Sequence, residues 1–495
     1  MNRNPILDPT LQEILQVIKP TRADWDTRIN VIDQLRTVLQ SLESLRGATV
    51  QPFGSFVSNL FTRWGDLDIS VDLFSGSSIL FTGKKQKQTL LGQLLRALRA
   101  SGFWYRLQFV VHARVPILKV VSGHQKISCD ISIDNLEGLL KSRFLFWISE
   151  IDGRFRDLVL LVKEWAKAHN INNPKNGTFN SYSLSLLVIF HLQTCMPAIL
   201  PPLREIYPRS AVDDLKGVRK TAEESIAQLS AANIARFKSG TSKPVNRSSL
   251  SELLISFFAK FSDINVKAQE LGVCPFTGRW ENISSNTAWL PKTYSLFVED
   301  PFEQPENSAR SVSRKNLDRI AQAFQMTCSR LALNCNRNSI IGVLTEQHIS
   351  QSLCRPSLPN HHHSNGVHNP RTPHGQSRPW NHQMQQNWSQ SYNVQNPPYW
   401  PGQARPRPQQ NWSGSQNYPR NLPVQPPVQG QSLPVITQTQ TQQKNQYKNG
   451  KLPVKNTTAG SSQNQGRIGK PPGQMNGVNF ARPAPVSQWR PRAEK

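Results

Sequence analysis

Cysteine is scarce in this sequence of 495 residues, with six residues that form neither a CxxC pair nor a regular spacing. This excludes a disulfide-stapled secreted domain and favours reduced thiols in a nuclear or cytosolic protein. Long apolar runs are also missing. The longest, around residues 184–192, is too short to cross a bilayer, and the N-terminus lacks the apolar segment of a signal peptide. We therefore expect no membrane attachment.

Acidic residues are few relative to basic ones. The chain has 58 Lys and Arg residues against 32 Asp and Glu, a formal net charge of +26 and a pI near 10.2. Such an excess predicts a polyanionic partner, and nucleic acid before a membrane surface.

The scarcity of acids is greatest after residue 350. Residues 351–495 hold 21 of the 36 prolines, 16 Lys and Arg residues and a single acid, Glu494, and they are rich in Gln, Asn and Ser. A segment of this composition buries too little apolar surface to offset its ordering entropy. We expect residues 346–495 to form a disordered basic tail.

Two aspartates stand at alternate positions of an apolar segment. In GSFVSNLFTRWGDLDIS, which begins at Gly54, the side chains of Asp66 and Asp68 would project from the same face of a strand. Two neighbouring carboxylates repel unless a cation lies between them, and Mg²⁺ is commonly held by one or two carboxylates and substrate phosphates. The Gly54-Ser55 turn upstream would offer N–H groups and a hydroxyl to phosphate oxygens.

An Asp-x-Asp pair on a strand is common and is often only structural, but a third acid strengthens the pattern. Residues 126–134, KISCDISID, alternate in the same way and place Asp130 on the face opposite the apolar side chains. Three carboxylates on two strands can hold two metal ions that stabilise the attacking and leaving oxygens of a phosphoryl displacement. The pattern predicts a site for nucleotidyl transfer.

These motifs resemble the nucleotidyltransferase superfamily of DNA polymerase beta, in its branch of poly(A) polymerases and terminal uridylyltransferases. The resemblance covers about residues 11–337 and rests on Gly54-Ser55, Asp66-x-Asp68 and Asp130. Three segments, QPFGSFVSNLFTRWGDLDIS, LVKEWAKAHNIN and VEDPFE, resemble the sequences of the plant uridylyltransferases that tail unmethylated small RNAs. The resemblance implies catalysis by the three aspartates with Mg²⁺ or Mn²⁺.

The order of predicted elements indicates an α+β fold. One helix is predicted to begin at a capping box of Thr21 and Asp24 and to end near residue 47. Further helices are predicted at 11–18, 89–100, 155–169, 248–261 and 316–333. Strands are predicted at 49–53, 104–111, 115–121 and around the three aspartates. The resemblance implies a polymerase beta-like catalytic domain with a mixed sheet at 47–137, a helical poly(A)-polymerase-associated domain at 138–345, and N-terminal helices, 1–46, that pack with the helical domain.

Several residues are candidates for binding the nucleotide. Lys163 and Lys167 lie one turn apart on a helix and suit either a triphosphate or a solvated basic face, and Tyr182 at a helix entrance suits either packing or base stacking. The resemblance implies that both lysines, Gly54, Ser55 and Ser181 contact phosphates, that Tyr182 stacks on the base, and that Asp300 and Glu303 lie near the base edge. The chain departs from the family pattern at two positions, with Glu306 where many uridine-selective relatives have histidine and Lys141 where relatives have a ribose-contacting asparagine.

The resemblance implies a template-independent RNA 3′-terminal uridylyltransferase that adds UMP from UTP to small RNAs without a 2′-O-methyl group, both microRNAs and siRNAs, and to fragments left by Argonaute, and so promotes their decay. A poly(A) polymerase using ATP is the alternative of the same class, and a non-catalytic RNA-binding scaffold acting through the tail is the alternative of another class. The spaced tail tryptophans suit either general aromatic contacts or the pockets of an Argonaute-type partner. We expect the protein in the nucleus and cytoplasm, including cytoplasmic RNA granules.

Overall fold

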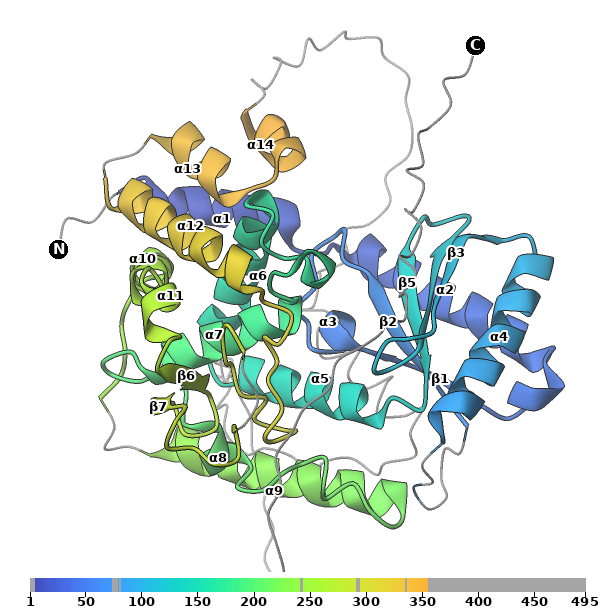
Figure 1. Cartoon of the computed structure of the whole chain (residues 1–495). Coiled ribbons are helices and arrows are strands. Elements are labelled where there is room, and N and C mark those ends of the chain that lie inside the picture. The colour runs from blue at the N-terminus through green and yellow to red at the C-terminus, as the bar shows by residue number, and fades with distance from the viewer. Residues whose placement is uncertain are drawn as a thin grey trace, which may run out of the picture. The chain divides into compact units, whose positions relative to one another are not determined.

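A mixed five-stranded sheet forms the centre of the N-terminal part of the protein (Figure 1). The computed structural model describes residues 5–73, 79, 82–240, 244–290, 294–333 and 336–354. The strand order is β1-β2-β5-β4-β3, and the strands are β1 (Thr49–Phe53), β2 (Leu67–Asp72), β3 (Trp104–Val110), β4 (Ile117–Ser122) and β5 (Ser128–Ile133). Only β2 and β5 pair in parallel. The predicted α+β class with a mixed sheet is confirmed.

The alternation along β2 separates a core face from a site face. Leu67, Ile69 and Val71 are fully buried on one side, and Asp68 lies on the other. Successive side chains of a strand point to opposite faces, so the apolar set fixes the direction of the acid. Helix α4 (Lys84–Ala100) packs on β3, β4 and β5 from the core side.

The site face is partly covered by two helices. Helix α3 (Gly54–Val57) follows β1 directly and packs on β1 and β2, and helix α5 (Leu136–Ser149) packs on α3 and β1. The nearby helix α2 (Arg22–Gln40) packs on β1 and α4. Its capping box of Thr21 and Asp24 is present as predicted.

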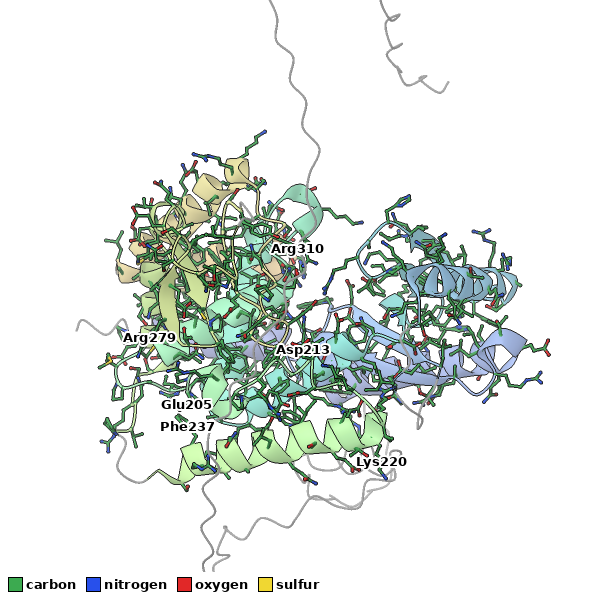
Figure 2. The ribbon with its side chains drawn as sticks, turned by 60° about the horizontal axis from the view of Figure 1, so that its bottom comes forward. Glu205, Asp213, Lys220, Phe237, Arg279 and Arg310 are labelled. Carbon is green, nitrogen blue, oxygen red and sulfur yellow. The ribbon has the colours of Figure 1, made fainter. Side chains whose placement is uncertain are left out.

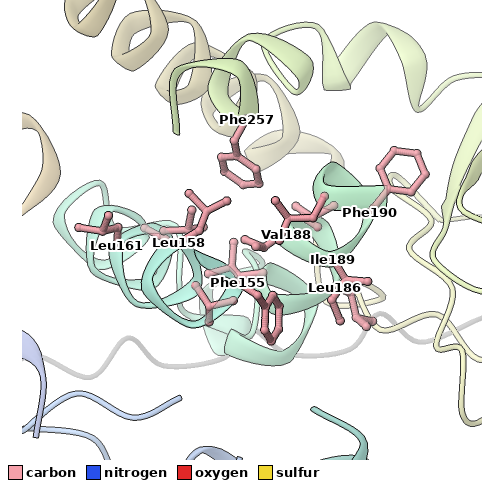
Figure 3. Packing of buried hydrophobic residues seen from close by; sticks show 14 of the residues in the cluster. Phe155, Leu158, Leu161, Leu186, Val188, Ile189, Phe190 and Phe257 are labelled. Atoms are coloured by element: carbon pink, nitrogen blue, oxygen red, sulfur yellow. The ribbon is translucent and has the colours of Figure 1, made fainter. Parts of the chain in front are cut away.

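The rest of the described chain is mainly helical and encloses the largest apolar cluster. Its interior is formed around α6 and α7, where Phe155, Leu158, Val188 and Phe257 are fully buried (Figure 3). The further elements are α1 (Leu7–Ile18), α6 (Gly153–Ala168), α7 (Ser181–Gln193), α8 (Leu203–Ile206), α9 (Arg219–Ser239), α10 (Leu250–Lys260), α11 (Ile264–Lys267), β6 (Leu271–Cys274), β7 (Arg279–Asn282), α12 (Arg314–Ala332), α13 (Arg337–Leu344) and α14 (Gln347–Cys354), with 3₁₀ turns at Glu43–Leu45 and Pro174–Asn176.

The N-terminal helices do not act as one unit. Helix α1 packs with α6, α10 and α13 of the helical part, as predicted, but the prediction is wrong for α2, which packs on the sheet. Aromatic contacts hold α2 there: the ring centroid of Trp25 in α2 lies 4.8 Å from that of Phe56 in α3 and 4.7 Å from that of Phe61.

Two further differences concern elements that local periodicity did not reveal. Helix α9 was not predicted because its few apolar residues alternate with Ser, Ala and charged residues; Figure 2 shows Lys220 and Phe237 near its two ends. Helix α14 extends the folded part beyond residue 345, where the tail was predicted to begin, because Ile349 is buried against the helical core. The remainder of the predicted tail lies outside the described residues.

Among the described residues, no helix combines the length and the apolar content that crossing a membrane requires.

Candidate active site

Two of the three predicted aspartates lie on adjacent strands, Asp68 on β2 and Asp130 on β5, and Asp66 directly precedes β2. Asp68 and Asp130 are register partners in the parallel pair β2 and β5, so their side chains leave the same face at the same level. Asp66 lies two residues before Asp68 and accepts a hydrogen bond from the Ser128 side chain of β5. The structure thus brings the three predicted carboxylates to one place on the site face.

Repulsion and loss of water make this cluster costly in its ionised form. Burial and the charges of Asp130 and Asp66 raise the pKa of Asp68 to about 7. Burial and the charge of Asp130 also raise the pKa of Asp66. A cluster of carboxylates with raised pKa values favours a bound cation, because the cation removes the repulsion that opposes ionisation.

Asp130 is the member of the cluster with a protein counter-ion. Lys119 on β4 is its register partner, and the Lys119 ammonium forms an ion pair with Oδ2 of Asp130. The other oxygen, Oδ1, is buried and has no hydrogen-bond partner.

The arrangement still fits a divalent metal. Within the described ranges, no group of three or more His, Cys, Asp or Glu side chains already has the arrangement of a metal site. An orphaned carboxylate oxygen beside two carboxylates with raised pKa values nevertheless provides the hard oxygen donors that Mg²⁺ and Mn²⁺ prefer. Asp66, Asp68 and Asp130 are therefore the residues that would hold such an ion.

Gly54 lies directly against this cluster. Its φ is +66°, and a Cβ atom at this position would lie 2.0 Å from Oδ2 of Asp68. Both the backbone conformation and the contact exclude a side chain. The predicted turn at Gly54-Ser55 is therefore the start of the single-turn helix α3, with glycine required by the acid beside it.

The predicted phosphate contact of the Gly54 amide does not agree with the hydrogen bonds. The Gly54 N–H donates to Oγ of Ser142 on α5 over 2.6 Å, and Ser142 donates in turn to the Gly138 carbonyl. Ser55 is half-buried in the first turn of α3 and remains the candidate phosphate ligand of this segment. Gly54 contributes through its missing side chain.

Two predicted lysines of α6 lie beside the acids. The buried Lys163 ammonium donates to the Leu60 carbonyl over 2.7 Å, and burial together with the charge of Lys167 lowers its pKa to about 8, against the opposing effect of Asp68. Lys167 also interacts electrostatically with Asp66. Both lysines therefore face the cluster, which favours a phosphate-binding role over a solvated basic face.

A second group of predicted residues forms the other end of the site. The Tyr182 hydroxyl donates to Oδ1 of Asp300 over 2.9 Å. Lys141 on α5 donates to Oδ2 of Asp300 over 2.6 Å and to Oε2 of Glu303 over 2.5 Å, and its ammonium lies 5.6 Å from the centroid of the Tyr182 ring. The structure brings Tyr182, Asp300 and Glu303 together around a lysine.

Arg114, in the connection between β3 and β4, completes this group from the sheet side. Its guanidinium hydrogen-bonds both carboxylate oxygens of Glu303. Burial opposes the charge of Glu303, but the hydrogen bonds from Arg114 and the charge of Lys141 outweigh it and lower the pKa of Glu303 to about 2. Glu303 is therefore ionised at every physiological pH and joins the sheet to the helical part.

Ser181 and Glu306 are the remaining positions named in the sequence analysis. Ser181 begins α7 and accepts a hydrogen bond from Nδ2 of Asn172 over 3.1 Å, beside the stacking candidate Tyr182. Glu306, at the position of the family histidine, has an ion pair with Arg310 at 3.4 Å.

Sequence reasoning missed Lys119, Arg114 and the role of Ser142, and it noted Lys141 only as a departure from the family pattern. Lys119 was detectable, since it is the polar residue between Leu118 and Val120 on a predicted strand, and pairing of β4 with β5 then puts it on the face of Asp130. Arg114 and Ser142 carry no local signal, because their partners are 189 and 88 residues away in the chain.

The part of the chain that contains the sheet matches a known protein family. Residues 7–150 match the family model described as "Poly(A) RNA polymerase, mitochondrial-like, central palm domain". The chain is 82% identical to Protein HESO1 of Arabidopsis thaliana over 485 residues, which cover 98% of this chain and 94% of that protein.

The chain is also similar to more distant nucleotidyltransferases. The terminal uridylyltransferase cid1 of Schizosaccharomyces pombe is 29% identical over 339 residues, which cover 64% of this chain and 77% of that protein. The crystal structure of the Cid1 poly(U) polymerase with bound MgGTP superimposes with a TM-score of 0.54 at 25% identity, covering 70% of this chain and all of that one.

Proposed function

Because this chain belongs to the poly(A) polymerase and terminal uridylyltransferase branch of the polymerase beta-like nucleotidyltransferases, we propose that it is a template-independent RNA 3′-terminal uridylyltransferase. One structural observation carries the proposal. Asp68 and Asp130 lie on one face of the paired strands β2 and β5, and Asp66 lies beside them just before β2. Gly54 is so close to Asp68 that any side chain at position 54 would displace the carboxylate. This is the arrangement that metal-assisted nucleotidyl transfer requires.

The reaction joins the RNA 3′-oxygen to the α-phosphorus of UTP, releases pyrophosphate and transfers the 3′-hydroxyl proton to solvent. Bound Mg²⁺ or Mn²⁺ would acidify that hydroxyl and neutralise the developing phosphate charge. Asp66, Asp68 and Asp130 would hold the ion. Lys163, Lys167 and Ser55 would orient the β- and γ-phosphates so that pyrophosphate leaves in line.

Base choice would be made at the other end of the site. Tyr182 provides a stacking surface, which grips every base about equally. Beside this ring, the carboxylates of Asp300 and Glu303 are hydrogen-bond acceptors and the Lys141 ammonium is a donor. Uracil has an N–H donor and carbonyl acceptors that such groups could bind. We propose UTP as the preferred nucleotide, with ATP and poly(A) addition as the second candidate because the family model carries that description.

The substrate proposal is narrower than the family assignment. We propose small RNAs with a free 2′-hydroxyl at the 3′ end, including microRNAs, siRNAs and Argonaute fragments, whose tailing promotes decay. A grip on the terminal 2′-hydroxyl would exclude a methyl group there. We also propose that the tail recruits an Argonaute-type partner through its spaced tryptophans, in the nucleus and the cytoplasm.

The test is extension of a short RNA with each of the four nucleotides in the presence of Mg²⁺, with a free or a 2′-O-methylated 3′ end. We expect extension with UTP, blocked by the methyl group and abolished in Asp66→Ala/Asp68→Ala, with an unchanged fold by circular dichroism. Preference for ATP would indicate the poly(A) polymerase. Extension that survives in the double variant would refute the metal site, and RNA binding without any extension would favour the scaffold.

A further inference from the structure

Acidic residues are absent from a long part of the catalytic domain. Between Asp72 and Asp130 the sequence has no Asp or Glu residue and nine basic ones: Lys84, Lys85, Lys87, Arg96, Arg99, Arg106, Arg114, Lys119 and Lys126. This stretch contains α4, β3 and β4, one half of the sheet. Charge of a single sign on one half of a domain attracts a polyanion.

The site face of this half carries a row of polar side chains. Asp130, Lys119 and Gln108 are successive register partners across β5, β4 and β3, so they lie on one face in a line that leads from the catalytic acids to the sheet edge. Of the described helices, α4 packs most closely on β3 and β4, and it covers the opposite face (Figure 1). The row is therefore open to a ligand.

An exposed aromatic residue, Tyr105, lies further along the edge strand β3 that ends this row at Gln108. Tyr105 pairs with Val121, on the same face as Lys119, and is 37% exposed. The ladder is interrupted directly after Tyr105 by a β-bulge, where Arg106 has a φ of +52°, a conformation that is unfavourable for arginine. The Arg106 guanidinium lies 6.0 Å from the centroid of the Tyr105 ring. The bulge thus presents a ring and a cation side by side.

The in-line geometry of the reaction indicates where the RNA lies relative to the sheet. The attacking oxygen and the leaving pyrophosphate must lie on opposite sides of the α-phosphorus. Lys163 and Lys167 of α6 interact electrostatically with Asp66 and Asp68, so in the proposed enzyme the pyrophosphate would leave on that side. The RNA 3′ end must then approach from the side of Asp130 on β5, and on that side β4 and then β3 continue the sheet to its edge.

We propose that the open half of the sheet, from Lys119 to Tyr105 and Arg106, binds the single-stranded RNA upstream of its 3′ end. Tyr105 stacks on one base, and Arg106 contacts an adjacent phosphate. Base stacking on an aromatic ring tolerates any base, so this surface holds RNA without reading its sequence. The inference rests on the proposed function, because it assigns the path of that enzyme's RNA substrate.

The test compares RNAs that do and do not reach the edge strand. Affinity for a labelled RNA of about 20 nucleotides would be measured by fluorescence anisotropy over a range of salt, and extension with UTP would be compared with that of an RNA of about 3 nucleotides. We expect Tyr105→Ala to weaken binding of the long RNA by about fivefold or more and Tyr105→Phe to retain it. Extension of the short RNA should not change.

The charge contact has a matched control. Arg106→Gln should reduce the dependence of log affinity on log salt by about 0.7, the value for one phosphate contact on a single strand. Arg96→Gln removes an exposed arginine from the same acid-free stretch, but on α4 and the opposite side of the sheet, and should have a much smaller effect. Equal losses of RNA affinity in the two variants would mean that the positive charge acts non-specifically, and would contradict a binding surface at Arg106.

The outcomes separate this inference from the proposed function. Failure of the unaltered protein to extend either RNA would refute the enzyme, and the binding comparison would still test the surface. Normal extension with unchanged long-RNA affinity in both Tyr105→Ala and Arg106→Gln would refute the surface and leave the enzyme standing.

Discussion

Gly54 and Asp68 approach each other so closely that a Cβ atom on residue 54 would overlap Oδ2 of the carboxylate, at 2.0 Å. We predict that Gly54→Ala lowers the rate of nucleotide addition at least about 100-fold, because a displacement of order 1 Å at the reacting centre has this effect. Gly47→Ala is the control, since Gly47 also has a positive φ, +84°, but nothing within 4 Å of the added atom. Both variants carry about 1–2 kcal/mol of backbone strain, so equal losses of activity would contradict the steric explanation.

Asp68 should make the metal-free protein less stable as the pH rises. Its pKa is about 7 in the folded chain and near 3.8 when unfolded, so the unfolded chain loses its proton first. Stability should therefore fall between about pH 4 and pH 7, by on the order of 2–4 kcal/mol, and stay low above that range.

The measurement is the melting temperature in EDTA as a function of pH. Asp68→Asn should remove most of this fall and raise the melting temperature at neutral pH, whereas Asp213→Asn, at an exposed carboxylate (Figure 2), should not. Added Mg²⁺ should stabilise the unaltered protein more than Asp68→Asn. A lower melting temperature for Asp68→Asn at pH 8 would contradict the repulsion argument.

Lys141 should control nucleotide affinity and base choice together. Lys141→Ala removes the ammonium that holds Asp300 and Glu303, and we predict a loss of about tenfold or more in kcat/KM for UTP, because the groups at the base edge are then less precisely positioned. The ratio of UTP to ATP use should also fall. Arg310→Ala removes an exposed cation from Glu306 nearby and should change kcat/KM less than about twofold. An unchanged nucleotide preference in Lys141→Ala would show that the base is read elsewhere.

Lys119 should compete with the metal for Asp130. We predict that Lys119→Met lowers the Mg²⁺ concentration needed for half-maximal extension, because the cluster becomes more negative. Since Lys119 also lowers the pKa of Asp66 and Asp68, its removal should move the acid limb of the pH–rate profile to higher pH. Lys84→Met, which removes a charge from the start of α4, is the control for net charge. A higher Mg²⁺ requirement in Lys119→Met would show that the lysine assists metal binding.

The strand faces were predictable because their signal has a period of two residues. Alternation alone placed Asp68 and Asp130 on polar faces, and the structure then added that the two strands pair in parallel at that level. The capping box at Thr21 was equally local. By contrast, the ion pair of Lys141 with Asp300 joins residues 159 positions apart, and its formation depends on how α5 packs against the loop that carries Asp300. No short window of sequence contains that information.

The same limit applies at Gly54. The sequence predicted a turn that offers N–H groups and a hydroxyl to phosphate, but it gave no sign that the Gly54 amide donates to Ser142, because that acceptor is 88 positions away. Helix α14 was missed for a different reason: eight residues are too few for periodicity, and burial of Ile349 supplies the stability that propensity does not.

Helix α5 holds both ends of the site through consecutive residues, Lys141 at Asp300 and Ser142 at the Gly54 amide. Any rotation of α5 moves the two contacts together. We therefore expect a substitution in α5 that relaxes nucleotide choice to slow the chemistry as well. A substitution in the loop around Asp300 is expected to alter nucleotide choice with less effect on the alignment of Gly54 and Asp68.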